Sequence, residues 1–94
     1  GIDVCAFVQV LLDRPDRDAA FIESLQELAA VQEAHHVTGP YSYLLKVRAA
    51  DTARLEALLA RIKGLPGVSH TETQIALSSP KESTALDLTD GDEG

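Results

Sequence analysis

The segment from Val37 to Val47 constrains the fold of this 94-residue chain more than any other, because it predicts a β-hairpin. Gly39 supplies the backbone freedom that a sharp turn needs, and Pro40 has a fixed φ. From Tyr43 onward, two sets of side chains alternate: Tyr43, Leu45 and Val47 on one face, and Leu44, Lys46 and Arg48 on the other. This is the period of a half-buried strand. The segment therefore predicts two antiparallel strands that meet at residues 39–40.

The patterns on either side of the hairpin predict one strand and one helix each. Period-two patterns cover about residues 3–12 and 68–77, and helical patterns cover about residues 16–29 and 52–62. The hairpin strands span residues 31–38 and about 43–49. The order is β-α-β-β-α-β, which predicts an α+β, ferredoxin-like sandwich: a four-stranded antiparallel sheet with two helices on one face. We expect this domain to occupy residues 1–77.

Local signals predict where the helices begin and end. Asp16 follows a break in the first strand and is a candidate N-cap of the first helix. Asp51 is the corresponding candidate for the second helix. Gly64 is placed to end that helix at C′, and the segment 65–67 prevents its continuation.

The first predicted strand is largely apolar on both faces. One face carries Val4, Ala6, Val8 and Val10, and the other carries Cys5, Phe7, Gln9 and Leu11. We therefore expect helices on one side and a second copy of the chain on the other. Cys5 is expected to be a buried core thiol, and as the single cysteine it excludes an internal disulfide.

Composition excludes several classes of function. The formal net charge of −7 argues against a nucleic-acid surface, and an RNA-recognition module would also need exposed aromatic side chains on its central strands. No apolar run is long enough to span a bilayer, so no membrane partner is expected and a reducing cytoplasm is the expected compartment. Residues 78–94 are acidic and lack periodicity, which predicts a disordered tail that is either simply solvated or competes electrostatically with DNA near an attached basic domain.

Four segments, in matching order and spacing, resemble the Lrp/AsnC (feast/famine) family of transcription regulators over nearly all of residues 1–77. The hairpin resembles the family pattern V-T-G-x-x-D-Y-L-L-x-V, and Leu65–Val68 with Thr71 and Thr73 is similar to L-P-G-V-x-x-T-x-T. Val4–Val10 resembles the family's first strand, and residues 31–34 resemble the segment before the hairpin. The resemblance implies the C-terminal effector-binding and oligomerisation (RAM) domain of a regulator, which is not an enzyme.

The resemblance also implies an effector site. Family effectors, typically amino acids, lie where dimers meet and are contacted by the turn between the second and third strands. The candidate effector-binding residues are Thr38, Gly39, Pro40, Tyr41, Ser42, Thr71 and Thr73. Backbone N–H groups around Gly39 suit a carboxylate, but Ser42 replaces the usual Asp and Pro40 removes a donor. The alternative is an ordinary turn on an assembling surface whose ligand site is weak or lost.

The implied assembly is a dimer that packs sheet against sheet, and larger rings, especially of four dimers. Gly1-Ile2 resembles the segment that follows the family's helix-turn-helix linker, so we expect a chain without that half: a fragment or a natural stand-alone member. Such a chain would reach DNA only through a helix-turn-helix domain that it does not contain.

Histidines and fold analogy supply the competing hypotheses. His35, His36 and His70 suggest a metal or haem site, but adjacent strand residues point to opposite faces and cannot chelate one ion, so no metal or cofactor is expected. Histidines at a subunit contact would instead make the oligomer sensitive to pH between about 5 and 7. A dimeric α+β barrel enzyme of the monooxygenase or haem-handling type shares the architecture, but no catalytic constellation stands out.

Overall fold

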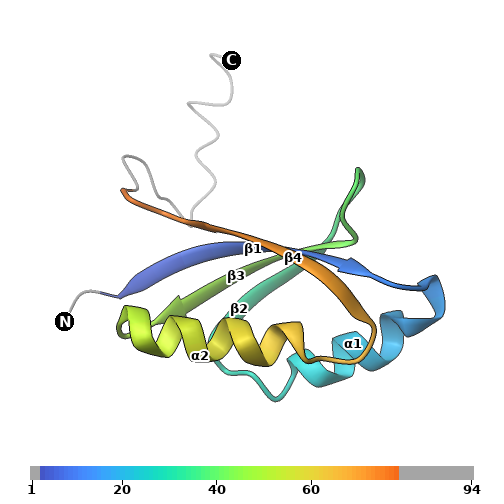
Figure 1. The fold of residues 1–94 in the computed structure, drawn as a ribbon, viewed down its shortest axis with the longest axis horizontal. Helices are drawn as coiled ribbons and strands as arrows, with labels where there is room; N and C mark the ends of the chain where they lie inside the picture. Colours follow the sequence, from blue (N-terminus) through green and yellow to red (C-terminus); the bar gives the residue numbers. More distant parts are fainter. Residues whose placement is uncertain (1–2, 79–94) are drawn as a thin grey trace, which may run out of the picture.

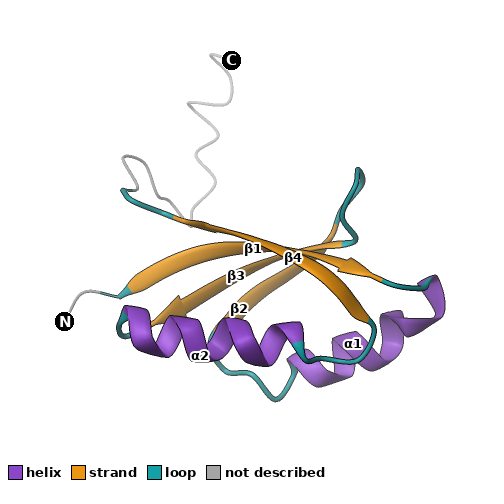
Figure 2. Ribbon diagram, in the orientation of Figure 1, coloured by secondary structure: helices purple, strands orange, loops and turns teal. Residues whose placement is uncertain are grey.

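The computed structural model of the chain describes residues 3–78 and confirms the predicted architecture. Its elements are β1 (Val4–Leu12), a 3-10 turn η1 (Pro15–Arg17), α1 (Asp18–Leu25), β2 (Val31–His36), β3 (Tyr43–Ala49), α2 (Thr52–Lys63) and β4 (Val68–Ile75). The strands form one sheet in the order β2-β3-β1-β4, and each neighbouring pair is antiparallel. Both helices lie on the same side of this sheet (Figures 1 and 2). The predicted acidic tail lies, from residue 79 on, outside the described residues.

The core lies between the sheet and the two helices. Period two places alternate residues of β1 and β3 toward the helices, and these residues are the most deeply buried in the sheet. The helices add one apolar stripe each, at the spacing that the sequence predicts. The buried cluster consists of Ala6, Val8, Val10, Leu12, Phe21, Leu25, Leu28, Tyr43, Leu45, Val47, Leu55, Leu58 and Ile62.

Within residues 3–78, no helix lies over the other face of the sheet, which corrects the prediction for Cys5. Cys5 is partly exposed on this face, beside Arg48 of β3, and is not part of the core. The reason is alternation: Val4 and Ala6 point toward the helices, so the residue between them points away. Phe7 lies on the same uncovered face and keeps 37% of its surface exposed.

The first helix differs from its prediction at both ends. Pro15 opens a 3-10 turn, so α1 begins at Asp18 with Arg17 as its N-cap, and no side chain caps it. Asp16 is therefore not the cap; it lies within η1 and pairs with Arg14 at 3.4 Å. The helix also stops at Leu25 rather than at about residue 29, because residues 26–28 continue as tighter turns with i→i+3 hydrogen bonds.

The predicted N-cap of the second helix is confirmed, and the helix ends at Lys63, one residue beyond the predicted Ile62. Asp51 Oδ1 accepts a hydrogen bond from the Arg54 N–H at 2.8 Å. Gly64 follows the last residue of α2, but its φ is −89°, which any residue adopts, rather than the left-handed value typical of a C′ glycine.

The left-handed conformation belongs instead to Gly67, which has φ of +80°. A Cβ on Gly67 would lie 2.6 Å from the Cβ of Arg17, and the Gly67 carbonyl accepts from the Asp13 N–H at 2.7 Å. The turn before β4 thus packs closely against the segment after β1.

Gly67→Ala is expected to destabilise the domain, because it adds both a clash with Arg17 and a left-handed side-chain residue. The expected loss is about 1–3 kcal/mol of the free energy of unfolding, measured by urea denaturation. Gly64→Ala is the matched control and should stay within about 0.5 kcal/mol of the parent protein, since its φ is ordinary and its added Cβ meets only normal contacts. Equal unfolding midpoints for the two variants would contradict the packing described here.

Candidate effector site and the open face of the sheet

The turn between β2 and β3 spans residues 37–42 and is the centre of the predicted site. It rises on the side of the sheet away from the helices (Figure 1). The Val37 N–H donates to the Ser42 carbonyl at 3.0 Å and closes the turn at its base. Gly39 has φ of +109°, as a sharp turn of this kind requires, and nothing lies within 4 Å of the position that its Cβ would occupy. The tip of the turn is therefore open to solvent.

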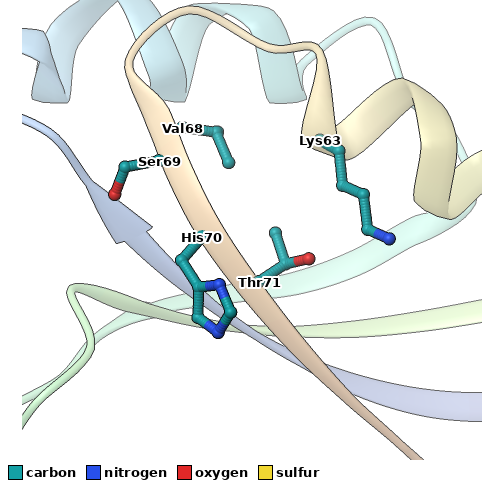
Figure 3. A pocket seen from close by; sticks show the side chains of 5 residues that line it. All are labelled: Lys63, Val68, Ser69, His70 and Thr71. Atoms are coloured by element: carbon teal, nitrogen blue, oxygen red, sulfur yellow. The ribbon is translucent and has the colours of Figure 1, made fainter.

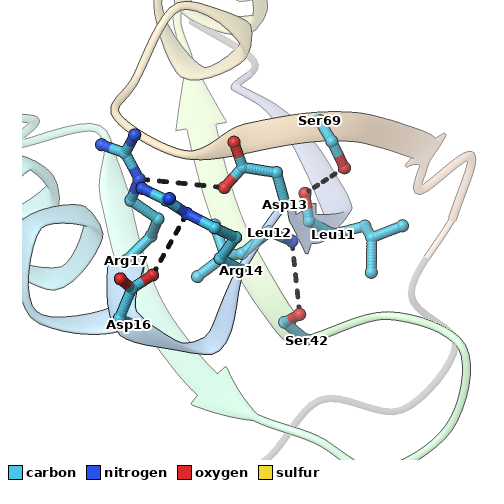
Figure 4. A network of polar contacts seen from close by, with 8 residues as sticks. All are labelled: Leu11, Leu12, Asp13, Arg14, Asp16, Arg17, Ser42 and Ser69. Atoms are coloured by element: carbon cyan, nitrogen blue, oxygen red, sulfur yellow. Dashed lines mark hydrogen bonds and ion pairs between the residues drawn. The ribbon is translucent and has the colours of Figure 1, made fainter.

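Ser42 ties the base of the turn to β1. Its N–H donates to the Val10 carbonyl at 2.8 Å, and its hydroxyl oxygen accepts from the Leu12 N–H at 3.3 Å. On the other side of β1, the Ser69 hydroxyl donates to the Leu11 carbonyl at 3.1 Å. Figure 4 shows the two side-chain contacts, of Ser42 with Leu12 and of Ser69 with Leu11, at the end of β1. The Ser42 hydroxyl thus has a structural task and keeps one proton with which to bind a ligand.

Tyr41 reaches across the open face to β4. Its hydroxyl donates to Glu72 Oε2 at 2.8 Å, and its ring stacks on the imidazole of His70 with centroids 6.1 Å apart. The hydrogen bond to the Glu72 carboxylate raises the pKa of Tyr41, because ionisation of the phenol would break that bond and place two negative charges together.

Thr71 and Thr73 lie on the opposite face of β4 from the Tyr41 contacts. They pair with Val10 and Val8, which point toward the helices, whereas Glu72 between them points to the open face. Thr71 lines a hollow of about 310 Å³ with Lys63, Val68, Ser69 and His70 (Figure 3). One chain by itself therefore does not gather all seven predicted residues on one surface.

Ser42 lines a second hollow, of about 260 Å³, near the start of α1. Its other lining residues are Leu12, Arg14, Pro15, Asp18 and His36. The hydroxyl of Tyr43 belongs to this end of the core: burial first, and then the nearby Asp18 carboxylate, raise the pKa of Tyr43. Thr38, Gly39, Pro40 and Tyr41 do not line this hollow.

The three histidines occupy different surroundings. His35 lies on the open face, where its Nε2 is 3.0 Å from Glu33 Oε1. His36 points the other way and stacks on Tyr43 with centroids 4.9 Å apart, so the prediction that the adjacent pair faces opposite sides is confirmed. The hydrogen bond from His35, with the charge of Lys46 nearby, lowers the pKa of Glu33. Across residues 3–78, no three His, Cys, Asp or Glu side chains gather in a way that could hold a metal ion.

Sequence reasoning missed the contact of Tyr41 with Glu72 and His70. The two β4 residues are two apart, which places them on one face of a strand, but their proximity to residue 41 depends on the register of β4 against β1. That register includes a shift between Leu11 and Leu12, for which the sequence carries no local signal.

The open face combines an apolar centre with charged neighbours. Its apolar members lie on the central strands and are Cys5, Phe7, Leu11 and Leu44. Glu33 and Lys46 form an ion pair toward one edge, with Lys46 Nζ 3.8 Å from Glu33 Oε2, and Glu72 stands at the other edge.

Neither helix among residues 3–78 has the length and apolar character needed to cross a membrane.

Comparison with known proteins identifies the relatives of this chain. The family model described as the Lrp/AsnC ligand binding domain matches residues 5–86. The leucine-responsive regulatory proteins of Escherichia coli K12 and Klebsiella pneumoniae are each 37% identical over 83 residues, which is 85% of this chain. The chain spans about half the length of these curated relatives, at 51%.

Solved structures agree with these relatives. Escherichia coli AsnC superposes with a TM-score of 0.80 at 29% identity, covering 87% of this chain and 56% of AsnC. TTHA0845 of Thermus thermophilus superposes with a TM-score of 0.75 at 35% identity, covering 84% of this chain and 99% of that protein. A feast or famine regulatory protein of M. tuberculosis, solved in complex with L-methionine, has a TM-score of 0.76 at 29% identity, covering 88% of this chain and 56% of the relative.

The curated relatives are regulatory proteins and the matching family model is a ligand-binding domain, so the comparisons support a regulator's domain and not the alternative of a barrel monooxygenase or haem-handling enzyme. Because the family model covers most of its length and the fold agrees, this chain belongs to the Lrp/AsnC family and contains its ligand-binding domain.

Proposed function

We propose that this chain senses an amino acid at the β2–β3 turn and self-associates through the open face of its sheet, as part of a cytoplasmic transcription regulator. The observation that carries the sensing role is a set of backbone donors at the turn. Among the hydrogen bonds between described residues, none uses the N–H of Thr38, Gly39 or Tyr41. Adjacent N–H groups at a turn suit a carboxylate, which every free amino acid carries. The relative solved with L-methionine supports the same class of effector.

Self-association is supported by the uncovered face. A domain of this size normally buries both faces of an apolar central strand, and the helices among residues 3–78 cover one face of β1. Phe7, Leu11 and Leu44 would form the dry centre of a contact, with charged residues at its rim. Such a contact between two copies, and rings of four dimers built from it, are our proposal for the assembly. Specific DNA contact would then come from a helix-turn-helix domain, since a chain with a formal net charge of −7 has little to offer phosphates.

Phe7→Glu tests the proposed contact. A carboxylate at the centre of the open face would be buried without a partner, so we expect light scattering to show a shift from dimers or larger species to monomers. The fold should survive, because Phe7 lies outside the core cluster. Ala57→Glu adds the same charge on the exposed side of α2 and should leave the mass unchanged. A monomeric parent protein would overturn the proposal.

Ser42→Asp tests the effector role of the turn. Restoring the acidic residue provides a charge for the ligand's ammonium group, and one carboxylate oxygen can still accept from the Leu12 N–H. We expect tighter binding of the amino acid that binds the parent protein, by about 1 kcal/mol or roughly fivefold, in isothermal titration. Ser42→Asn, which has similar shape but no charge, is the control. Unchanged or weaker binding by Ser42→Asp would count against this role for position 42.

A further inference from the structure

We propose that Tyr41, Glu72 and His70 form a latch that holds the β2–β3 turn against β4, so that Tyr41 is the positioning residue of the effector site. This proposal deepens the proposed function and rests on it for its consequence in ligand binding. The latch itself is a property of the unliganded chain and can be tested without any ligand.

The contact of Tyr41 with β4 is not expected from the strand order alone. The sheet order places β2 at one edge and β4 at the other, with β3 and β1 between them. The connection between β2 and β3 would ordinarily contact only those two strands. Instead, Tyr41 passes over β1 and bonds to Glu72, 31 residues further along the chain. The turn is thereby fastened to the far edge of the sheet.

Two neighbouring residues anchor the same arm of the turn in different ways. Ser42 fastens the backbone to β1 through Val10 and Leu12, and Tyr41 fastens the side chain to β4. The opposite arm, residues 38–40, is exposed and makes no such contact with the described part of the chain. The latch therefore fixes one side of the turn and leaves the glycine side free to close around a ligand.

The chemistry of the latch suits a defined geometry. A phenol that donates to a carboxylate makes a directional, charge-assisted bond, and stacking on His70 restricts the ring to one plane. His70 and Glu72 lie two residues apart on β4 and share one face, so Glu72 can hold the hydroxyl of Tyr41 while His70 contacts its ring. With its side chain fixed, Tyr41 also presents its own backbone N–H in one direction; this is one of the three N–H groups of the turn that bond to no other described residue.

The position of Glu72 links the latch to the open face. Glu72 pairs with Gln9 of β1 and shares the face on which a second copy would pack. Removal of water from that face strengthens the Tyr41–Glu72 bond, because a hydrogen bond gains strength in a lower dielectric. Self-association should therefore stiffen the turn, and by reciprocity a ligand that needs the stiff turn should favour self-association.

The first test is a titration that isolates Tyr41. The chain has two tyrosines, so the Tyr43→Phe variant leaves Tyr41 as the only phenol, and its ionisation can be followed by ultraviolet absorbance. We expect Tyr41 to ionise at a higher pH in this variant than in the double variant Tyr43→Phe/Glu72→Gln, which keeps an acceptor oxygen but loses the charge. Identical titration curves would overturn the latch.

The second test is amide hydrogen exchange of the turn. Tyr41→Phe removes the hydroxyl and keeps the ring, so we expect the Val37 and Ser42 amides to exchange about tenfold faster, the size of effect that a lost charge-assisted hydrogen bond produces. Tyr43→Phe removes the other hydroxyl, on the helix side of the sheet, and should leave the ratio of turn exchange to core exchange unchanged. Equal turn exchange in Tyr41→Phe and the parent protein would also overturn the latch.

A ligand-binding experiment distinguishes failure of this proposal from failure of the proposed function. With L-methionine as the probe, Tyr41→Phe should bind more weakly than the parent protein by the same factor as the change in turn exchange. Should the parent protein bind neither L-methionine nor any other amino acid, the sensing function fails, while the titration and exchange results still decide whether the latch exists. Equal L-methionine affinity with faster turn exchange would overturn the positioning role.

Discussion

The structure depends on one constraint: successive residues of a strand point to opposite faces, and the helices cover only one of them. The even-numbered residues of β1 and the odd-numbered residues of β3 share the buried face, because the register pairs Val8 with Leu45 and Val10 with Tyr43. Every other position on these strands is then directed to the open face. The location of Cys5 and Phe7, and of the polar contacts made by Tyr41, follows from this division.

The end of β1 is the point where the parts of the candidate site are joined. Ser42 at the base of the turn and Ser69 of β4 bind its backbone from two sides, and Gly67 packs against Arg17 just beyond it. These contacts come from segments far apart in the sequence, and together they fasten the base of the turn. The turn is consequently an ordered feature at its base and an open one at its tip, a combination that suits recognition of a small ligand.

The departures of this chain from its family pattern have structural consequences. Pro40 removes one donor from the tip of the turn, so fewer N–H groups remain for a carboxylate. Ser42 carries out the backbone contact to β1 without providing a charge. Tyr41, at a position that the pattern leaves unspecified, contacts Glu72 across the sheet on the same side of the turn. Under the proposed function, ligand preference in this chain therefore depends more on neutral donors than on an acidic side chain.

The sequence by itself determined the order and type of the elements, the apolar stripes of both helices and the Asp51 cap, because each depends on periodicity or on residues three or four positions apart. The sequence-based predictions were wrong where two neighbouring residues could each play the same local role, because a residue pattern does not show which of them does. Pro15 imposed a 3-10 turn where Asp16 had capping chemistry, and the positive φ belongs to Gly67, where an added Cβ would also clash with Arg17, and not to Gly64.

Only the tertiary structure decided which face of β1 is left open, where Thr71 and Thr73 point, and that Tyr41 meets Glu72. These features depend on strand register and on one-sided helix packing. Both are set by contacts between segments that lie far apart in the sequence, and no local pattern of residues encodes such contacts.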